Sequence, residues 1–383
     1  MSGKADSGGA LESAALPGSA DRVVLEILIH GPLSRVELAR RLGLSGPSLT
    51  RLTKPLIASG RLIERTPQAR ELGRPQQPLD LDPKTEHCAG VKITADALYT
   101  VITDLRGSVR AESQEKLATH EPAEVASAIV RQVRLLAAPF APLSAIGISL
   151  GGRTSDGRTI NESNILEWDD VPLADLVEQD SGVPTVVAND VNALTQAQHW
   201  FGAGRELTSF VVVTIGAGIG MGVVAGGELA AGLHGAAGSI GHQVLTHSDA
   251  MCWRGHRGCA SALLSTRAVE RAASDAGRPA GYDDILRGAE RGDPILRRVV
   301  DVAGDALGIL LASVANAFDP QKIVLAGEGA RLGEVGEHAM LSAVRANQAW
   351  RSATTPIDVQ PFAFNEWARG AAATAIQARM LRG

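Results

Sequence analysis

The chain has 383 residues, of which 45% are hydrophobic and 21% are charged, so it is long enough for two or three compact domains. Its three cysteines are too few for a disulfide scaffold and are typical of a reducing compartment. The sequence contains no run of about 18 apolar residues, so we expect no membrane-spanning helix. Residues 1–20 lack the basic and apolar segments of a secretion signal. We therefore expect a cytoplasmic protein that begins with a flexible tail over residues 1–20.

The net charge of −5 is unevenly distributed along the chain. Residues 34–74 contain nine basic and three acidic side chains, a net +6, so the rest of the chain carries −11. A basic segment on an acidic body indicates a polyanionic partner for that segment alone. A solvated basic face would have the same charge pattern.

Three short helices are predicted near the start of the chain. Residues 21–30 place their apolar side chains on one face, as a helix does. A second helix begins after Ser34 and a third after Ser45, because each serine is a favourable N-cap. Pro55, inside the third helix, predicts an irregularity near Lys54. Two short helices joined by a tight turn are typical of a helix-turn-helix.

This arrangement predicts a winged helix-turn-helix domain over residues 21–82 that binds double-stranded DNA. The third helix would present polar and basic side chains to the major groove: Ser45, Ser48, Thr50, Arg51 and Lys54. Two short strands around a basic loop then predict a wing, from which Arg70 and Arg74 would reach the DNA backbone or minor groove. A protein-interaction module is the alternative that the helical pattern leaves open.

Strand and helix signals alternate over residues 87–383, which is typical of the α/β class. Strands are predicted at residues 88–93, 99–103, 146–150, 185–188, 210–215 and 322–326, and helices at 122–138, 191–200 and 294–318. The apolar stripe of the last helix indicates packing in a core or a dimer interface.

Residues 214–259 form the most distinctive stretch of the body. A β-branched strand breaks into four alternating glycines, a pattern that lets the backbone approach a phosphate closely. His242, Cys252 and Cys259 follow, and imidazole and thiolate are ligands for soft metals. The stretch indicates a nucleotide and metal site or the remnant of one.

Three motifs in this stretch, TIGAGIGMGVV, HGAAGSIGHQ and CWRGHRGC, resemble in order and spacing the signature of the ROK family. That family contains actin-like sugar kinases and sugar-responsive repressors. Many of the repressors carry a winged module that ends in a sequence like Gly73-Arg74-Pro75. The resemblance begins near Gly90 and implies a two-lobed actin-like, ribonuclease H-like fold for the body.

The departures from the family pattern predict that this body is not an active kinase. In ROK kinases a D-x-G-G-T hairpin holds the ATP phosphates and their metal. The matching residues here are Lys92-Ile93-Thr94-Ala95-Asp96, with a lysine in place of the carboxylate and no glycine. Phosphoryl transfer depends on positioning and charge neutralisation, so these losses should abolish it. Asp190 matches the catalytic base of the family.

The resemblance assigns contacts with a carbohydrate-like effector to four residues: Asn164, Asn189, Asp190 and His242. Helix capping by Asp190 and turn formation by Asn164 are the structural alternatives. Ser239 and Ser261 stand where the family has sugar-binding glutamates. We therefore expect an altered effector or none.

The same resemblance implies a zinc site that has lost one ligand. The family uses one histidine and three cysteines, whereas Arg254 here replaces the middle cysteine beside His242, Cys252 and Cys259. Either His247 or His256 would complete a four-coordinate site. A metal-free loop is the alternative, and it is slightly favoured because a guanidinium beside the site opposes a dication.

We therefore expect a ROK-type transcriptional regulator, a repressor of carbohydrate metabolism that is not an enzyme. It should be a homodimer or a higher homo-oligomer, because paired recognition helices require two half-sites. The alternatives are a sugar kinase with an appended DNA-binding domain and a DNA-binding protein that responds to no effector.

Overall fold

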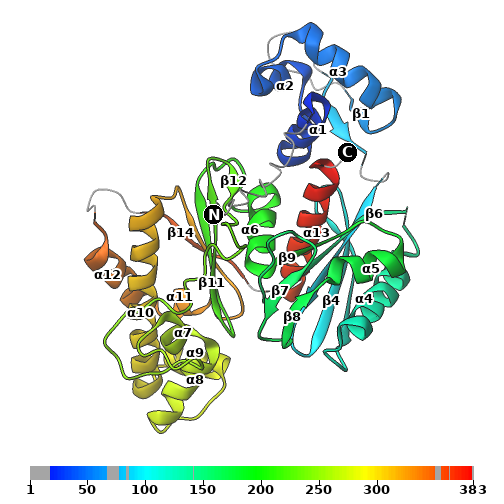
Figure 1. Cartoon of the computed structure of the whole chain (residues 1–383). Helices are drawn as coiled ribbons and strands as arrows, with labels where there is room; N and C mark the ends of the chain where they lie inside the picture. The colour runs from blue at the N-terminus through cyan, green and yellow to red at the C-terminus, as the bar shows by residue number, and fades with distance from the viewer. Residues whose placement is uncertain are drawn as a thin grey trace, which may run out of the picture. The chain divides into compact units, whose positions relative to one another are not determined.

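The computed structural model in Figure 1 describes residues 18–66, 77–82, 86–140, 142–349, 355–361 and 363–381. Its internal contacts divide the chain into two units. The first unit contains residues 1–86 together with residues 376–383, and the second contains residues 87–375.

The first unit is built from three helices and a small sheet. Its elements are α1 (Ser19–His30), α2 (Arg35–Leu42), α3 (Gly46–Ala58), β1 (Leu62–Glu64) and β2 (Leu79–Leu81). Strand β1 pairs antiparallel with β2, and Leu33, just before α2, bridges to Leu79 of β2. The buried side chains of the three helices form the core, with Val24, Ile27, Leu38 and Leu49 all at 0% exposure. Helices and sheet together have the winged helix-turn-helix pattern.

Local chemistry sets the ends of these helices. The Ser34 hydroxyl accepts a hydrogen bond from the Glu37 amide at 3.2 Å, and the Ser45 hydroxyl accepts one from the Ser48 amide at 3.3 Å. Helix α3 continues through Pro55 to Ala58, so the predicted irregularity does not end it. Pro55 is exposed, and the backbone carbonyl that lacks its partner can therefore bind water.

The second unit contains two five-stranded sheets of the same topology (Figure 1). The first has the order β5-β4-β3-β6-β9 and the second β12-β11-β10-β13-β14. In each, three antiparallel strands are followed by two parallel ones. The strands are β3 (His87–Ile93), β4 (Ala97–Asp104), β5 (Val109–Lys116), β6 (Leu143–Leu150), β9 (Thr185–Asn189), β10 (Phe210–Ile215), β11 (Ile219–Ala225), β12 (Glu228–Leu229), β13 (Ile323–Ala326) and β14 (Ile357–Val359). The hairpin of β7 (Ile160–Ser163) and β8 (Trp168–Val171) forms a separate two-stranded sheet.

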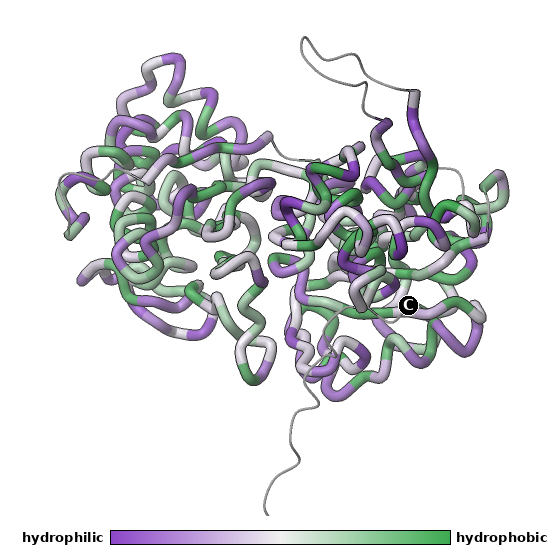
Figure 2. The backbone as a smooth tube through the Cα atoms, turned by 90° about the horizontal axis from the view of Figure 1, so that it is seen from above, coloured by the Kyte–Doolittle hydropathy of each residue, from purple (hydrophilic) through white to green (hydrophobic). Residues whose placement is uncertain are grey.

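Helices cover both sheets and bury two main cores. Around the first sheet are α4 (Pro122–Ala137) and α5 (Leu173–Ser181), and around the second are α7 (Ala260–Leu264), α8 (Thr266–Asp275), α9 (Tyr282–Glu290), α10 (Pro294–Phe318), α11 (Leu332–Val335) and α12 (Glu337–Asn347). Apolar segments run through the interior of this unit in Figure 2. Helix α10 is long and apolar enough to cross a membrane by length and composition, but 61% of its most apolar window is buried inside the protein. The apolar composition of α10 is therefore explained by its burial in the protein core.

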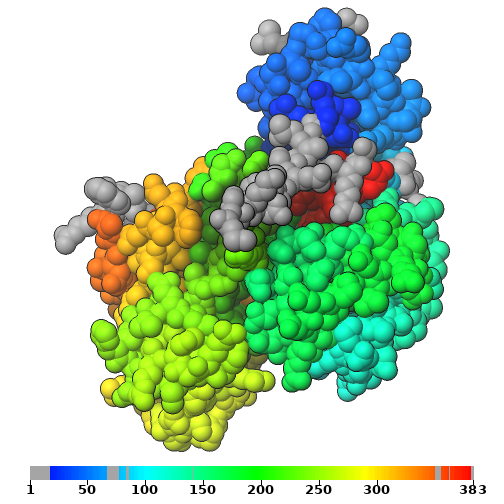
Figure 3. Space-filling model, viewed as in Figure 1, coloured from blue at the N-terminus to red at the C-terminus, as the bar shows by residue number. Residues whose placement is uncertain are grey.

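Two crossing helices connect the lobes. Helix α13 (Phe364–Leu381) follows the second sheet but packs on the first, so closely that a Cβ on Gly90 of β3 would lie 2.0 Å from the Ala368 carbonyl oxygen. Conversely, α6 (Asp190–Phe201) follows the first sheet and packs on the second, where a Cβ on Gly222 would lie 2.0 Å from the Thr195 hydroxyl. The lobes appear as two masses with a recess between them in Figure 3. The start of α6 therefore lies where the lobes meet.

Candidate functional sites

Asp190, which the sequence predicts to match a catalytic base, forms an internal ion pair with Lys92. Lys92 on β3 donates its Nζ to Oδ2 of Asp190, the first residue of α6. The two side chains are only 8% and 16% exposed, and the ammonium also lies 5.1 Å from the centre of the Trp367 ring. The other carboxylate oxygen of Asp190 accepts the Val191 amide at 2.9 Å. Both oxygens of this carboxylate therefore already have donors.

A carboxylate from the loop after β13, that of Glu328, contacts the glycine-rich turn after β10. An oxygen of the Glu328 carboxylate accepts the Ala217 amide at 2.9 Å, and a Cβ on Gly216 would lie 2.5 Å from the same oxygen. Backbone amides in such a turn are the groups that bind a phosphate. Here a side-chain carboxylate bonds to one of them. No feature of the sequence alone identified Glu328 as part of this site.

The predicted effector residues lie on different elements and have different partners. Asn189 is the N-cap of α6, accepting the amides of Val191 and Asn192, and its Nδ2 donates to the Gly152 carbonyl at 2.9 Å. The capping role considered for Asp190 therefore belongs to Asn189. Asn164 is exposed after β7, with its Nδ2 3.5 Å from Oε1 of Glu162.

Four side chains meet in the loop between β12 and α7. The ligand atoms of His242, Cys252, His256 and Cys259 all lie within 4.8 Å of one another. Nδ1 of His242 is 3.5 Å from Sγ of Cys252 and 3.9 Å from Sγ of Cys259, and Nδ1 of His256 is 3.7 Å from Sγ of Cys252. A tetrahedral zinc ion requires sulfur and nitrogen ligands about 3.6 Å apart, from Zn–S and Zn–N bonds of about 2.3 and 2.05 Å. The residues therefore fit a Cys₂His₂ zinc ion, with His256 rather than His247 in the fourth position.

The protonation chemistry of this cluster suits a metal. Burial, followed by the nearby His256 and Arg254, lowers the pKa of His242, which keeps its ring neutral and able to coordinate. Burial opposes ionisation of Cys252, but backbone amides that donate to its sulfur outweigh it and lower the thiol pKa. Burial raises the pKa of Cys259. A bound cation favours the thiolate form of both cysteines.

Arg254, next to the four ligands, also contacts a carboxylate and an aromatic ring. Its guanidinium lies 3.6 Å from a carboxylate oxygen of Glu162 and 4.9 Å from the centre of the Trp253 ring. The charge that seemed to oppose a dication is thus partly balanced by a carboxylate.

In the first unit, most cations of the basic segment are neutralised by acidic neighbours. Five arginines form ion pairs: Arg35 with Glu64, Arg40 and Arg41 with Glu37, Arg61 with Asp21, and Arg65 with Asp80. Arg51 and Lys54 of α3 are exposed and form no ion pair with any residue that the structure describes. Arg70 and Arg74, predicted for the wing, lie outside the described residues. The unneutralised positive charge described in this segment is therefore concentrated on α3.

The remaining DNA-binding candidates lie at the start of the same helix. The Ser45 hydroxyl donates to that of Ser48 at 2.9 Å, and the Thr50 hydroxyl donates to the Gly46 carbonyl at 3.0 Å. All three hydroxyl oxygens retain lone pairs, so they can still accept hydrogen bonds.

A model of the ROK family matches residues 88–378. The chain belongs to the ROK family. Among its relatives is a putative xylose repressor from Caldicellulosiruptor sp. (strain Rt8B.4), 27% identical over 337 residues that cover 82% of this chain and 84% of the relative. Another is the DNA-binding transcriptional dual regulator NagC of Escherichia coli (strain K12), 28% identical over 315 residues that cover 78% of this chain and 77% of NagC.

Solved structures of ROK proteins have the same fold. A ROK family transcriptional regulator described as a homolog of the E. coli MLC protein superposes with a TM-score of 0.81 at 23% identity, covering 95% of this chain and 98% of the regulator. A ROK glucokinase from Streptomyces griseus, solved with glucose and AMPPNP, has a TM-score of 0.67 at 25% identity. It covers 76% of this chain, and 99% of the glucokinase is matched. The predicted two-lobed actin-like fold of the ROK body is confirmed.

Proposed function

We propose that this ROK protein is a DNA-binding transcriptional regulator, with a winged helix-turn-helix domain at residues 21–82 and a sugar-kinase-derived body at residues 87–383. The observation that carries the proposal is the location of charge on α3. Arg51 and Lys54 are exposed there and pair with no acidic residue that the structure describes, whereas the other described cations of the basic segment have acidic partners. A helix with free cations and hydroxyls on its exposed face suits the major groove. The names of relatives such as NagC support the same function.

We further propose that the body does not transfer phosphate. A kinase needs Asp190 free to accept a proton from a sugar hydroxyl, but Lys92 neutralises that carboxylate. Glu328 would also repel a phosphate from the turn at Ala217. Asp190 is nevertheless the feature that favours a sugar kinase as the second candidate. A coupled ATPase assay with a panel of sugars decides: sugar-dependent turnover that Asp190→Ala abolishes would restore the kinase.

The effector of this regulator would be carbohydrate-like and bind between the lobes. The family resemblance assigns its contacts to Asp190 and His242, together with Asn164 and Asn189. Because Ser239 and Ser261 replace two carboxylates, charge-assisted bonds to neutral sugar hydroxyls are fewer. The pocket therefore differs in selectivity from that of the kinases, or the regulator responds to no sugar.

We also propose zinc in the loop cluster, held by His242, Cys252, His256 and Cys259. Structural zinc would fix the conformation of the loop that carries His242, and so orient a predicted effector contact. The regulator would act as a homodimer or a higher homo-oligomer on paired half-sites, in the cytoplasm where operator DNA is accessible.

The proposal is tested by selecting sequences from a random DNA duplex library with purified full-length protein. We expect enrichment of a site with two related halves about one helical turn, or a multiple of it, apart. The Arg51→Ala, Lys54→Ala double variant should lose the enrichment while keeping its thermal stability. A wild-type protein that enriches no sequence would contradict the proposed function.

A further inference from the structure

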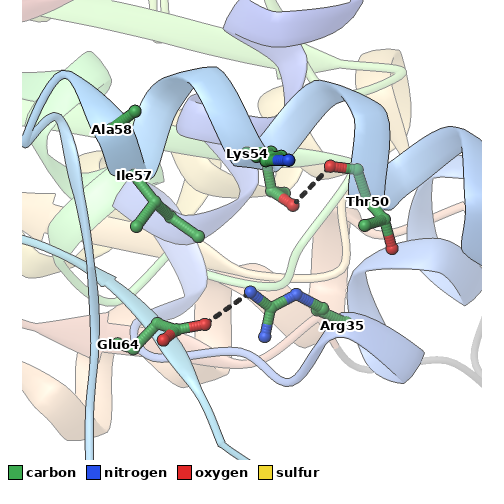
Figure 4. A pocket seen from close by; sticks show the side chains of 7 residues that line it. Arg35, Thr50, Lys54, Ile57, Ala58 and Glu64 are labelled. Carbon is green, nitrogen blue, oxygen red and sulfur yellow. Dashed lines mark hydrogen bonds and ion pairs between the residues drawn. The ribbon is translucent and has the colours of Figure 1, made fainter.

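A shallow pocket of about 330 Å³ lies in the first unit, beneath α3 (Figure 4). It is lined by Arg35, Thr50, Thr53, Lys54, Ile57, Ala58 and Glu64. Arg35 and Glu64 face each other on one side, and α3 forms the other side (Figure 4). The pocket thus joins the recognition helix to the first residue of α2 and the last residue of β1.

The pocket is lined by more cationic than anionic side chains. Nη2 of Arg35 lies 2.6 Å from Oε1 of Glu64, and the second carboxylate oxygen accepts from Nε2 of Gln77 at 3.3 Å. Lys54 makes no ion pair with a described residue. Two cations and one carboxylate therefore line the pocket. Since only one nitrogen of the guanidinium contacts Glu64, its other N–H groups remain able to donate.

We propose that this pocket receives a phosphate of the DNA backbone, and that Arg35 exchanges Glu64 for that phosphate on binding. The inference rests on the proposed DNA-binding function. The Arg35 and Glu64 side chains are 34% and 36% exposed, and an ion pair so exposed contributes little to stability. A phosphate offers Arg35 a charge-assisted, bidentate partner and releases a counterion. Glu64 then acts as an internal competitor that weakens binding to any polyanion that does not reach the pocket.

The opposite interpretation is that the pair is a structural tie between α2 and the wing strand. The Glu64→Gln variant distinguishes the two interpretations, because glutamine keeps the shape and a hydrogen-bond acceptor but removes the charge. If Glu64 competes with phosphate, this variant binds DNA more tightly. If the pair is only a tie, the variant binds DNA equally or more weakly.

The experiment measures fluorescence anisotropy of a mixed-sequence DNA duplex against full-length protein at increasing KCl. We expect Arg35→Gln to reduce the slope of log K against log[salt] by about 0.9, the loss of one phosphate contact. Between about 50 and 200 mM KCl its affinity should fall about 3.5-fold less than that of wild type. Glu64→Gln should bind more tightly than wild type, and Arg35→Gln should remove that gain in the double variant.

Asp284→Asn in the second unit is the charge-matched control, because it also removes one carboxylate that pairs with an arginine, Arg287, at 2.8 Å. It should leave affinity and slope unchanged. An Arg35→Gln slope equal to that of wild type, or equal or weaker binding by Glu64→Gln, would overturn the phosphate site while the proposed function stands. Failure of the wild type to bind any duplex would overturn the proposed function, and this inference with it.

Discussion

At the scale of single residues, the proposed absence of phosphoryl transfer rests mainly on one ion pair, between Lys92 and Asp190. The ammonium of Lys92 on β3, a residue that the family resemblance matches to a carboxylate of the kinases, binds the carboxylate of Asp190 on α6. The two charges are mostly removed from water, with side chains 8% and 16% exposed. Such a pair contributes little net stability, but either charge left alone is costly.

Lys92→Met should therefore destabilise the body by about 3 kcal/mol, because Asp190 keeps a buried charge with no counter-ion. Adding Asp190→Asn removes that charge and should recover most of the loss. Urea unfolding of the two single variants and the double variant gives the coupling energy of the pair. Additive effects of the two substitutions would contradict the pairing.

A second residue-scale prediction concerns Arg51. If Arg51 contacts a base edge, Arg51→Ala should cost about 1–3 kcal/mol of operator binding and relax specificity at one position. If it contacts only phosphate, the loss should be uniform across sequences with a shallower salt slope. Competition titrations with matched and mismatched duplexes distinguish these cases. Unchanged affinity would exclude Arg51 from the interface.

At the scale of elements, two helices hold the lobes together by crossing from one sheet to the other. The contact between α13 and the first sheet leaves no room for a methyl group on Gly90, because Ala368 and Ala372 of α13 lie against it. This close packing explains the small residues along α13, including Ala371 and Ala375.

Gly90→Ala should thus destabilise the second unit by about 1–3 kcal/mol or more through overpacking. Gly218→Ala is the matched control, since a Cβ there meets no atom within 4 Å. Thermal unfolding of the two variants and the wild type checks the difference. Equal melting temperatures for both alanine variants would show that α13 is not packed as described.

Another prediction concerns the proposed zinc ligands in the loop between β12 and α7. Purified protein should contain about one zinc ion per chain, and its Co²⁺ form should have the tetrahedral spectrum of two thiolates rather than three. His256→Ala should reduce metal content, whereas His247→Ala should not, because His247 is exposed and outside the cluster. Metal retained equally by both variants would exclude His256 as a ligand, and protein without metal would favour a metal-free loop.

At the scale of the whole molecule, regulation requires that effector and DNA affinity be coupled. A sugar that raises the melting temperature should change operator affinity by about 5–150-fold if it binds two states of the protein differently. A thermal-shift screen of sugars and sugar phosphates, followed by operator titration with each stabilising compound, checks this. Stabilisation without any change in DNA affinity would contradict an allosteric role, and no stabilising sugar would favour the effector-independent alternative.

The sequence by itself determined the elements whose signals are local. The caps at Ser34 and Ser45 and the bounds of β10 and α10 follow from side chains within a few residues of each helix or strand end. The three glycine and cysteine motifs were sufficient to predict the ROK family. Irregular segments such as the β7–β8 hairpin carry weaker local signals and were not predicted.

Only the tertiary structure decided which distant residues meet. Lys92 and Asp190 are 98 positions apart, and Glu328 and Ala217 are 111 apart, so no local pattern reports their contact. The same holds for the choice of His256 over His247 beside Cys252, which depends on how the loop folds back on itself. Sheet register and helix crossing bring charged residues together that are far apart in the sequence. The sequence therefore predicted an inactive kinase from residue types alone, but it did not predict the Lys92–Asp190 ion pair or the contact of Glu328 with the glycine-rich turn.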